Sequence, residues 1–147
     1  MAMIKLENIE VKFDSFVALK EINIDIQEGE FFTFLGPSGC GKTTTLRTIT
    51  GFIKPTKGRV YVRDVDITDM PVEKRNVGMV FQSYALFPTM SVYENIAFGL
   101  KVQKMAQDKI REKVLSMAEK VELSEDQLRK KVSQLSGGQQ QRVAIAR

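Results

Sequence analysis

The chain has 147 residues, of which 43% are apolar and 27% charged, and this composition is typical of a globular domain, so we do not expect a disordered chain. Its net charge of +4 comes with no basic run interleaved with aromatic residues, so we expect a solvated polar face between Lys101 and Lys131, not a nucleic-acid patch. The single Cys40 excludes an internal disulfide and favours a reducing, intracellular compartment, and no apolar run approaches the roughly 20 residues that span a bilayer.

The first thirty residues predict two antiparallel strands, because apolar and polar residues alternate from Ile4 to Phe13 and again from Ile22 to Ile26. Two later runs have a different character. Residues 31–35 (FFTFL) and 77–81 (VGMVF) are short continuous apolar runs, of the kind that is buried on both faces of a parallel sheet. We therefore expect each of them to form a buried strand.

The other predicted elements are marked by turn and cap signals. Residues 42–52 fit a helix closed by Gly51, and the turn 54–58 leads to a strand at 59–62. Capping signals and helical spacing indicate three further helices. The first begins at the capping pair Ser91 and Glu94, and the third begins at the capping pair Ser124 and Gln127. The second is an amphipathic helix over 106–121, whose apolar stripe is Ile110, Val114, Met117 and Val121.

Residues 36–43 (GPSGCGKT) match the phosphate-loop pattern G-x-x-x-x-G-K-[ST]. They follow a predicted buried strand and precede a predicted helix, which is the arrangement that such a loop requires. The glycines let backbone N–H groups converge on an anion, Lys42 brings charge to the β- and γ-phosphates, and the Thr43 hydroxyl is placed to coordinate Mg²⁺. The alternative is a glycine-rich strand-to-helix turn with an exposed lysine, which this context disfavours.

A second glycine-containing loop lies near the end of the chain, at 135–139 (LSGGQ). Gly137 and Gly138 behind Ser136 offer backbone donors at the start of a helix, so an anion is the natural ligand. Taken alone, the sequence Ser-Gly-Gly is also a common flexible turn. The helix that follows is compatible with the sequence up to Arg147, and we expect Val143, Ala144 and Ile145 on it to need burial.

With both loops in this order, the chain resembles the ATP-binding subunits of ABC transporters. An aromatic residue near the start, the Walker A loop, a Q-loop within MVFQSYALFP and the signature LSGGQQQR carry the resemblance, which covers essentially all 147 residues. It implies an α/β P-loop NTPase with an incomplete RecA-like core, an N-terminal antiparallel β-subdomain and a helical subdomain over about 83–136. The sequences of 36–52 and 81–100 look most like those of the ATPases of bacterial importers for polyamines, ferric iron, sugars or phosphonates.

The resemblance also assigns residues to ATP and Mg²⁺. Thr43 and Gln82 are implied for the metal, and Gln82 further for the attacking water and for signalling to membrane subunits through the loop that follows it. The signature residues are implied to cap ATP that is bound to the opposite subunit. In full, the implied nucleotide contacts are Phe13, Gly36, Pro37, Ser38, Gly39, Cys40, Gly41, Lys42, Thr43, Thr44, Ser136, Gly137, Gly138 and Gln139.

Two of these interpretations have plain alternatives. Phe13 is implied to stack on adenine, but it also continues the face of Ile9 and Val11 and could be core, while Phe16 is a local alternative for stacking. Gln82 could be an ordinary loop residue at a strand end. We also expect the aromatic side chains of 83–88 (SYALFP) to be exposed and to form an interface, because an apolar loop tip is costly in water.

The implied partners are a second ATP-binding subunit in a head-to-tail dimer and membrane permease subunits, with no nucleic acid, on the cytoplasmic side of the cell membrane. Hydrolysis in the family needs an apolar strand that ends in Asp-Glu and a later histidine. The chain has no histidine, and its nearest strand of that kind, ending at Asp64, is interrupted by Arg63. We therefore expect residues 1–147 to be truncated before the Walker B strand, to be marginally stable, and to bind nucleotide without turning it over.

Two other functions remain as alternatives. One is a non-catalytic nucleotide-binding fragment. The other is an ABC-type ATPase of chromosome maintenance or DNA repair, which has a long coiled coil between the two loops. The interval between Thr43 and Leu135 contains no sustained heptads, so this second alternative is disfavoured.

Overall fold

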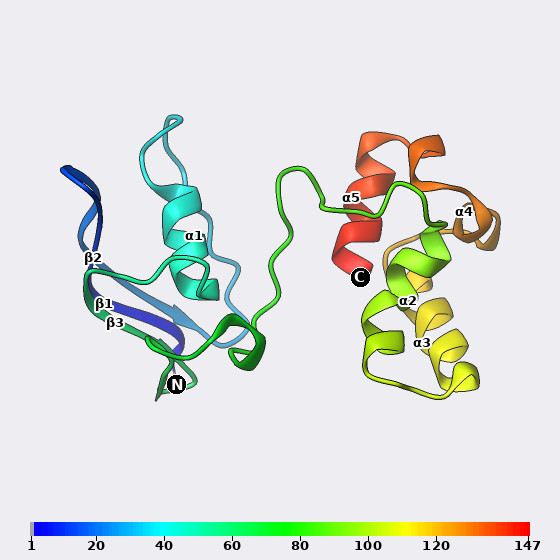
Figure 1. The fold of residues 1–147 in the computed structure, drawn as a ribbon, viewed down its shortest axis with the longest axis horizontal. Coiled ribbons are helices and arrows are strands. Elements are labelled where there is room, and N and C mark those ends of the chain that lie inside the picture. The colour runs from blue at the N-terminus through cyan, green and yellow to red at the C-terminus, as the bar shows by residue number, and fades with distance from the viewer. Residues whose placement is uncertain (1) are drawn as a thin grey trace. The chain divides into compact units, whose positions relative to one another are not determined.

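The computed structural model describes residues 2–147, which divide into two compact units, one ending at Met79 and the other running from Val80 to Arg147. The first unit is a sheet with one α-helix, and the second is helical (Figure 1). Each unit has a hydrophobic core of its own.

The sheet of the first unit has the strand order β2-β1-β3-β4, and all neighbouring strands are antiparallel. The alternating apolar residues set the register, with Leu6 opposite Ile24 on one side and Val60 on the other. The strands predicted in the first thirty residues and at 59–62 are thus confirmed. Their bounds are β1 Ala2–Phe13, β2 Phe16–Gln27, β3 Lys57–Val62 and β4 Val65–Asp66.

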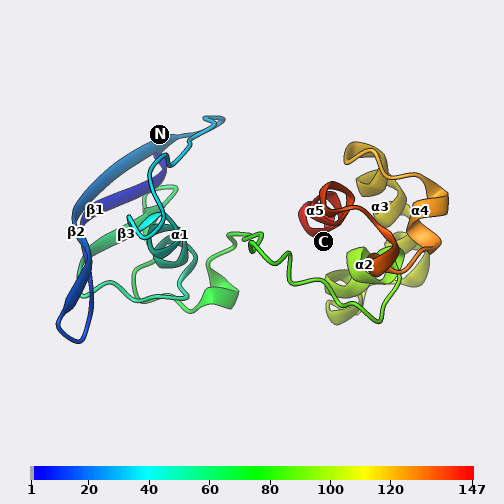
Figure 2. The same cartoon turned by 90° about the horizontal axis from the view of Figure 1, so that it is seen from above.

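Helix α1, Lys42–Thr50, lies along one face of this sheet (Figures 1 and 2). It ends at Gly51, whose φ of 91° is left-handed, as expected for a glycine cap. The side chains buried between helix and sheet come from four elements and one loop, and they are Leu6, Ile9, Val11, Leu19, Ile49, Val60 and Ile67.

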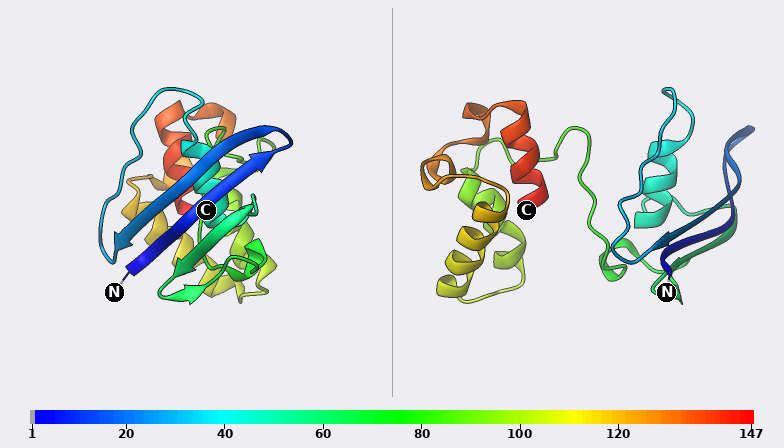
Figure 3. Two further views of the ribbon diagram at one scale, coloured as in Figure 1. Left: turned by 90° about the vertical axis from the view of Figure 1, so that its left-hand side faces the viewer. Right: turned by 180° about the vertical axis from the view of Figure 1, so that it is seen from behind.

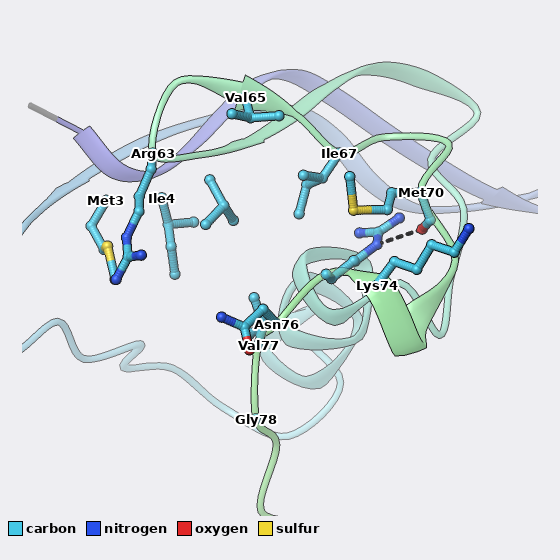
Figure 4. Close-up of a pocket in the computed structure, with 12 residues that line it drawn as sticks. Met3, Ile4, Arg63, Val65, Ile67, Met70, Lys74, Asn76, Val77 and Gly78 are labelled. Carbon is cyan, nitrogen blue, oxygen red and sulfur yellow. Dashed lines mark hydrogen bonds between the residues drawn. The ribbon is translucent and has the colours of Figure 1, made fainter. Parts of the chain in front are cut away.

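Arg75 joins the end of α1 to the segment that follows the sheet. Its side chain is 4% exposed, and its guanidinium donates to the carbonyls of Thr48 and Ile49 at 2.9 Å. It donates further to Thr68 O at 2.9 Å and to Met70 O at 2.8 Å, the bond dashed in Figure 4. Burial lowers the pKa of Arg75, while these four carbonyls each accept a hydrogen bond from its guanidinium. Arg75 therefore binds two carbonyls at the C-terminal end of α1 and two in the segment that follows the sheet.

The two predicted buried strands are absent from the structure. Residues 31–35 and 77–81 have no strand conformation, and Phe31 and Leu35 are 94% and 98% exposed. A strand forms only where a neighbour completes its hydrogen bonds and other residues cover its faces. Within residues 2–147 the sheet places neither segment beside a strand, so the prediction of these two strands is wrong here.

The second unit packs its helices around a core that includes Ile96, Val114 and Val143 (Figure 3). The capping boxes predicted at Ser91 and Ser124 are both present. Its helices are α2 Val92–Val102, α3 Gln107–Lys120, α4 Glu125–Arg129 and α5 Gly137–Ala146, with a short 3-10 turn at Val132–Gln134.

Glu94 gives the first of these caps a dependence on pH. Hydrogen bonds from the Ser91 backbone and hydroxyl lower the pKa of the Glu94 carboxyl. A lowered pKa means that the cap stabilises α2 above the ordinary carboxyl pKa. This contribution is lost as the pH falls through the lowered value.

Three predictions about burial in the second unit are wrong. Met117 is exposed and Ala118 occupies the core instead, because the helix turns 100° per residue and the buried stripe drifts by one position. Ile145 is exposed, whereas Val143 and Ala146 are buried. The loop aromatics expected at the surface, Tyr84 and Phe87, are half-buried.

Replacing Arg75 by alanine should lower the free energy of unfolding of the first unit by about 2 to 4 kcal/mol, because four carbonyls lose a buried donor. Urea unfolding followed by NMR of the β1 and α1 amides measures this. Arg59→Ala is the matched control, since Arg59 is an exposed arginine of the same unit whose Nη1 lies 3.6 Å from Asp66 Oδ2. Equal effects of the two substitutions would contradict the role given to Arg75.

Candidate nucleotide-binding site

The loop before α1 turns sharply at two glycines. Gly39 and Gly41 have φ of 84° and 92°, values that favour glycine. A Cβ at Gly41 would lie 2.6 Å from Leu19 Cδ2, so a side chain there would collide with β2. The loop is thus shaped by close approach to the sheet as well as by its own turns.

The N-terminus of α1 offers unpaired donors. The first helical bond of this turn runs from Thr45 N to Gly41 O at 2.8 Å, and the N–H groups of Lys42, Thr43 and Thr44 come before it. The N-cap is a glycine with no side-chain cap, and the first turn has no acidic residue. In contrast, a serine hydroxyl caps each of α2, α4 and α5. The start of α1 is therefore electropositive and suited to an anion.

Lys42 folds back into this loop. Its Nζ donates to Gly36 O at 2.6 Å and to Pro37 O at 2.7 Å, and it lies 3.4 Å from Cys40 Sγ. These contacts hold the ammonium within the loop that leads directly into the N-terminus of α1. Two sources of positive charge therefore converge on one site.

The threonines of α1 fall into two groups. Thr45, Thr48 and Thr50 are buried, and their hydroxyls donate to carbonyls four residues earlier. Among residues 2–147, the hydroxyls of Thr43 and Thr44 make no hydrogen bond. These two hydroxyls are therefore available to a ligand at the helix start.

The donor set around Thr43 fits Mg²⁺ only together with phosphate. In the part of the chain that the structure describes, no group of three or more acidic, histidine or cysteine side chains could hold a metal ion. Mg²⁺ commonly takes one or two protein ligands and completes its shell with water and substrate phosphates. A single hydroxyl at the phosphate loop is consistent with that mode of binding.

Phe13 lies at the end of β1, where it pairs with Phe16 across the hairpin. It is 47% exposed and lies beyond the buried Ile9 and Val11. The core alternative for Phe13 is therefore not supported. Phe16 is also exposed, so both phenylalanines remain available for stacking.

Gln82 belongs to the second unit, where it is exposed and begins the turn 82–85. Tyr84 N donates to Phe81 O at 2.8 Å within this turn. Tyr84 and Ala85 both have left-handed backbone conformations, with φ of 61° and 50°. The loop thus has a defined shape without being a strand or a helix.

The signature residues open helix α5. Gln139 N donates to Ser136 Oγ at 3.4 Å, and Ser136 N donates to Gln139 Oε1 at 2.9 Å. Two residues predicted to serve a nucleotide thus also form a capping box. The Ser-x-x-Gln spacing is the signal that could have revealed this box from the sequence.

Gly137 and Gly138 have no role in the fold that explains them. Neither has a positive φ, and a Cβ at either would meet nothing within 4 Å. In a helix interior, glycine is about 1 kcal/mol less favourable than alanine, so glycine is not chosen for helix stability. Their bare backbone is suited to close approach by another molecule.

The predicted residues divide between the two units. Phe13 and the loop 36–44 lie in the first unit, whereas Gln82 and 136–139 lie in the second. Two residues that organise these groups, Arg75 and Asn95, escaped prediction because their burial depends on tertiary packing. No local pattern in the sequence marks either of them.

One hollow in the first unit is separate from the phosphate loop. It has a volume of about 440 Å³ and lies among Met3, Ile4, Val65, Ile67 and Val77 (Figure 4). None of the residues that line it belongs to 36–44. Its walls are mainly apolar, so the converging charges of the phosphate loop remain the chemical site of this unit.

Among residues 2–147, no helix is both long and apolar enough to cross a membrane.

Known proteins resemble this chain over nearly all of its length. A family model described as "ABC transporter" matches residues 19–147. The spermidine/putrescine import ATP-binding protein PotA of Acetivibrio thermocellus is 55% identical over 145 residues, which are 99% of this chain and 41% of that protein. The chain thus spans about two-fifths of that relative.

Solved structures give the same result. One is described as the dimeric structure of MJ0796, a bacterial ABC transporter cassette. It has a TM-score of 0.86 and 38% identity, over 98% of this chain and 68% of that one. MJ0796 in a post-hydrolysis state with ADP and Pi has a TM-score of 0.84 at the same identity and coverage. These likenesses confirm the predicted α/β fold class.

Proposed function

The chain belongs to the ABC transporter family of ATP-binding proteins, and on that premise we propose that it is the nucleotide-binding part of an importer's ATP-binding subunit. The observation that carries the proposal is the start of α1, where unpaired N–H groups and Lys42 converge. No acidic residue in the first turn neutralises that charge. Such a helix end is complementary to phosphate groups. ATP, held by 36–44, is the proposed ligand.

Each residue of the loop has a separate task in this proposal. Gly39 and Gly41 set the turns that aim the backbone donors, and Lys42 exchanges its loop carbonyls for the β- and γ-phosphates. Thr43 and Gln82 would hold Mg²⁺, which when bound neutralises phosphate charge. Phe13 would stack on adenine, and its exposure at the hairpin end supports this role.

The signature residues are proposed to serve a second subunit. Ser136, Gly137, Gly138 and Gln139 would face ATP that is bound to the partner in a head-to-tail dimer. The absence of any steric reason for the two glycines supports a role toward an incoming molecule. MJ0796 is described as dimeric, which agrees with this arrangement.

Transport is the proposed role of the whole protein. ATP binding and hydrolysis would drive solute import through permease subunits at the inner face of the membrane, with a helical subdomain over about 83–136 facing them. Polyamines are the proposed cargo, since the similar PotA is named as a spermidine/putrescine importer protein. For residues 1–147 alone we propose nucleotide binding without turnover, because the chain has no histidine and no apolar strand that ends in Asp-Glu.

Replacing Lys42 by alanine should weaken ATP binding at least about 100-fold, because a charge-assisted contact with the phosphates is lost. Isothermal titration calorimetry of the purified chain measures the affinity. Lys54→Ala is the control, since Lys54 is an exposed lysine of the same unit that pairs with Asp69. Unchanged affinity after Lys42→Ala would refute the phosphate assignment.

Replacing Gly137 by alanine should leave the chain as stable as before, or more stable by up to about 1 kcal/mol, because alanine favours the helix. The same change should weaken the ATP-dependent dimer, because a methyl group would then occupy the approach path of the partner's nucleotide. Urea unfolding and sedimentation with a slowly hydrolysed ATP analogue give the two values. Gly99→Ala, within α2, is the matched control. An unchanged dissociation constant of the ATP-dependent dimer would contradict the role proposed for Gly137.

A further inference from the structure

The loop that follows Gln82 is held in an unfavourable backbone conformation. Tyr84 and Ala85 are consecutive non-glycine residues with positive φ. Each left-handed residue of this kind is disfavoured, so the pair persists only where surrounding contacts fix it. The question is which residues supply those contacts.

Asn95, in the first turns of α2, supplies the central ones. Its Oδ1 accepts from Phe87 N at 2.8 Å, and its Nδ2 donates to Phe87 O at 3.1 Å. Nδ2 donates also to Ser91 O at 2.9 Å. One side chain thus binds both backbone groups of Phe87, as a neighbouring strand would.

Because Asn95 is buried, its amide needs all three of these hydrogen bonds. The side chain is 0% exposed and lies within a core that includes Val92 and Ile96. A buried amide is tolerated only when its polar atoms are paired. Only one orientation of the amide places an acceptor against the Phe87 N–H and donors against two carbonyls.

Contacts on the side chains hold the same loop from α2 and α5. The Phe87 ring lies 4.6 Å from the Phe98 ring. The Arg147 guanidinium lies 4.4 Å above the Phe87 ring and also donates to Ala85 O. The loop is therefore fixed at Ala85 and Phe87, on either side of Leu86, while Gln82 at its start is exposed.

We propose that Asn95 is a positioning residue, which fixes the backbone at Phe87 and thereby sets the conformation of the loop that begins at Gln82. Without its three hydrogen bonds, only the contacts of Arg147 and the Phe87 ring would hold the loop, and the positions of Tyr84, Ala85 and Gln82 would become less fixed. The inference rests on the proposed function only for the task of Gln82, namely contact with the nucleotide's metal ion.

Amide hydrogen exchange of the whole chain tests the inference, with Asn95→Ala compared with Val114→Ala. Val114 is fully buried in the same core, so both variants remove a side chain of similar size from one packing unit. Asn95→Ala should speed exchange of the Phe87 amide about tenfold relative to α3 amides. Val114→Ala should leave that ratio near its original value. Equal ratios in the two variants would overturn the proposal.

A second variant separates the bond that Asn95 accepts from the two bonds that it donates. Asn95→Asp keeps an acceptor for Phe87 N–H but cannot donate to Phe87 O and Ser91 O when ionised. The Phe87 amide should then lose part of its protection while α3 keeps its own. Full protection of the loop in Asn95→Asp would contradict a role for the two donated bonds.

The link to the nucleotide is read separately, from the dependence of ATP affinity on Mg²⁺. Gln82→Ala and Asn95→Ala should reduce this dependence by similar factors, and the double variant should lose no more than Gln82→Ala alone. Additive losses would overturn the idea that Asn95 acts through Gln82. If Gln82→Ala has no effect, the role proposed for Gln82 fails, while the exchange ratio still decides whether Asn95 fixes the loop.

Discussion

Helix α1 begins with donors that the chain itself does not satisfy, and the candidate site of the first unit depends on that constraint. Gly41 at the N-cap offers no side chain, and the first turn contains no carboxylate to balance the helix dipole. Lys42 adds its charge to the same place and is held there by loop carbonyls. An end of this kind is stable only because solvent or an anion can reach it.

The rest of the first unit fixes where that helix end lies. Packing of Ile49 against the sheet orients the helix, and the close contact between Gly41 and Leu19 sets the distance of the loop from β2. At the other end, Arg75 donates to the last carbonyls of α1. In the second unit, Asn95 has a comparable task, since a buried polar side chain replaces a missing secondary-structure partner for a loop. Both residues combine burial with hydrogen bonds to several backbone groups, which makes the geometry around them specific.

Features that depend on a few neighbouring residues could be predicted from the sequence. The hairpin of β1 and β2, the glycine end of α1 and the caps at Ser91 and Ser124 all follow from local patterns, and the structure has them. The pattern G-x-x-x-x-G-K-[ST] at 36–43 is local in the same sense, because its spacing and context in the sequence are enough to predict a phosphate loop. In contrast, the strand expected at 31–35 requires a partner strand, and a partner is a property of the tertiary fold. The burial of Arg75 and Asn95 also depends on tertiary packing, so the residues next to them in the sequence do not predict it.

The central claim is that α1 binds phosphate directly, whereas α5 presents its glycines to a nucleotide on another subunit. NMR titration of the chain with ATP, at concentrations where it is monomeric, tests this most directly. The account predicts that the amides of Gly39 to Thr44 shift along one saturable curve, while those of Gly137 to Gln139 stay in place until a dimer forms. Shifts at the α5 amides with the same affinity in the monomer, or no shifts at the start of α1, would contradict it.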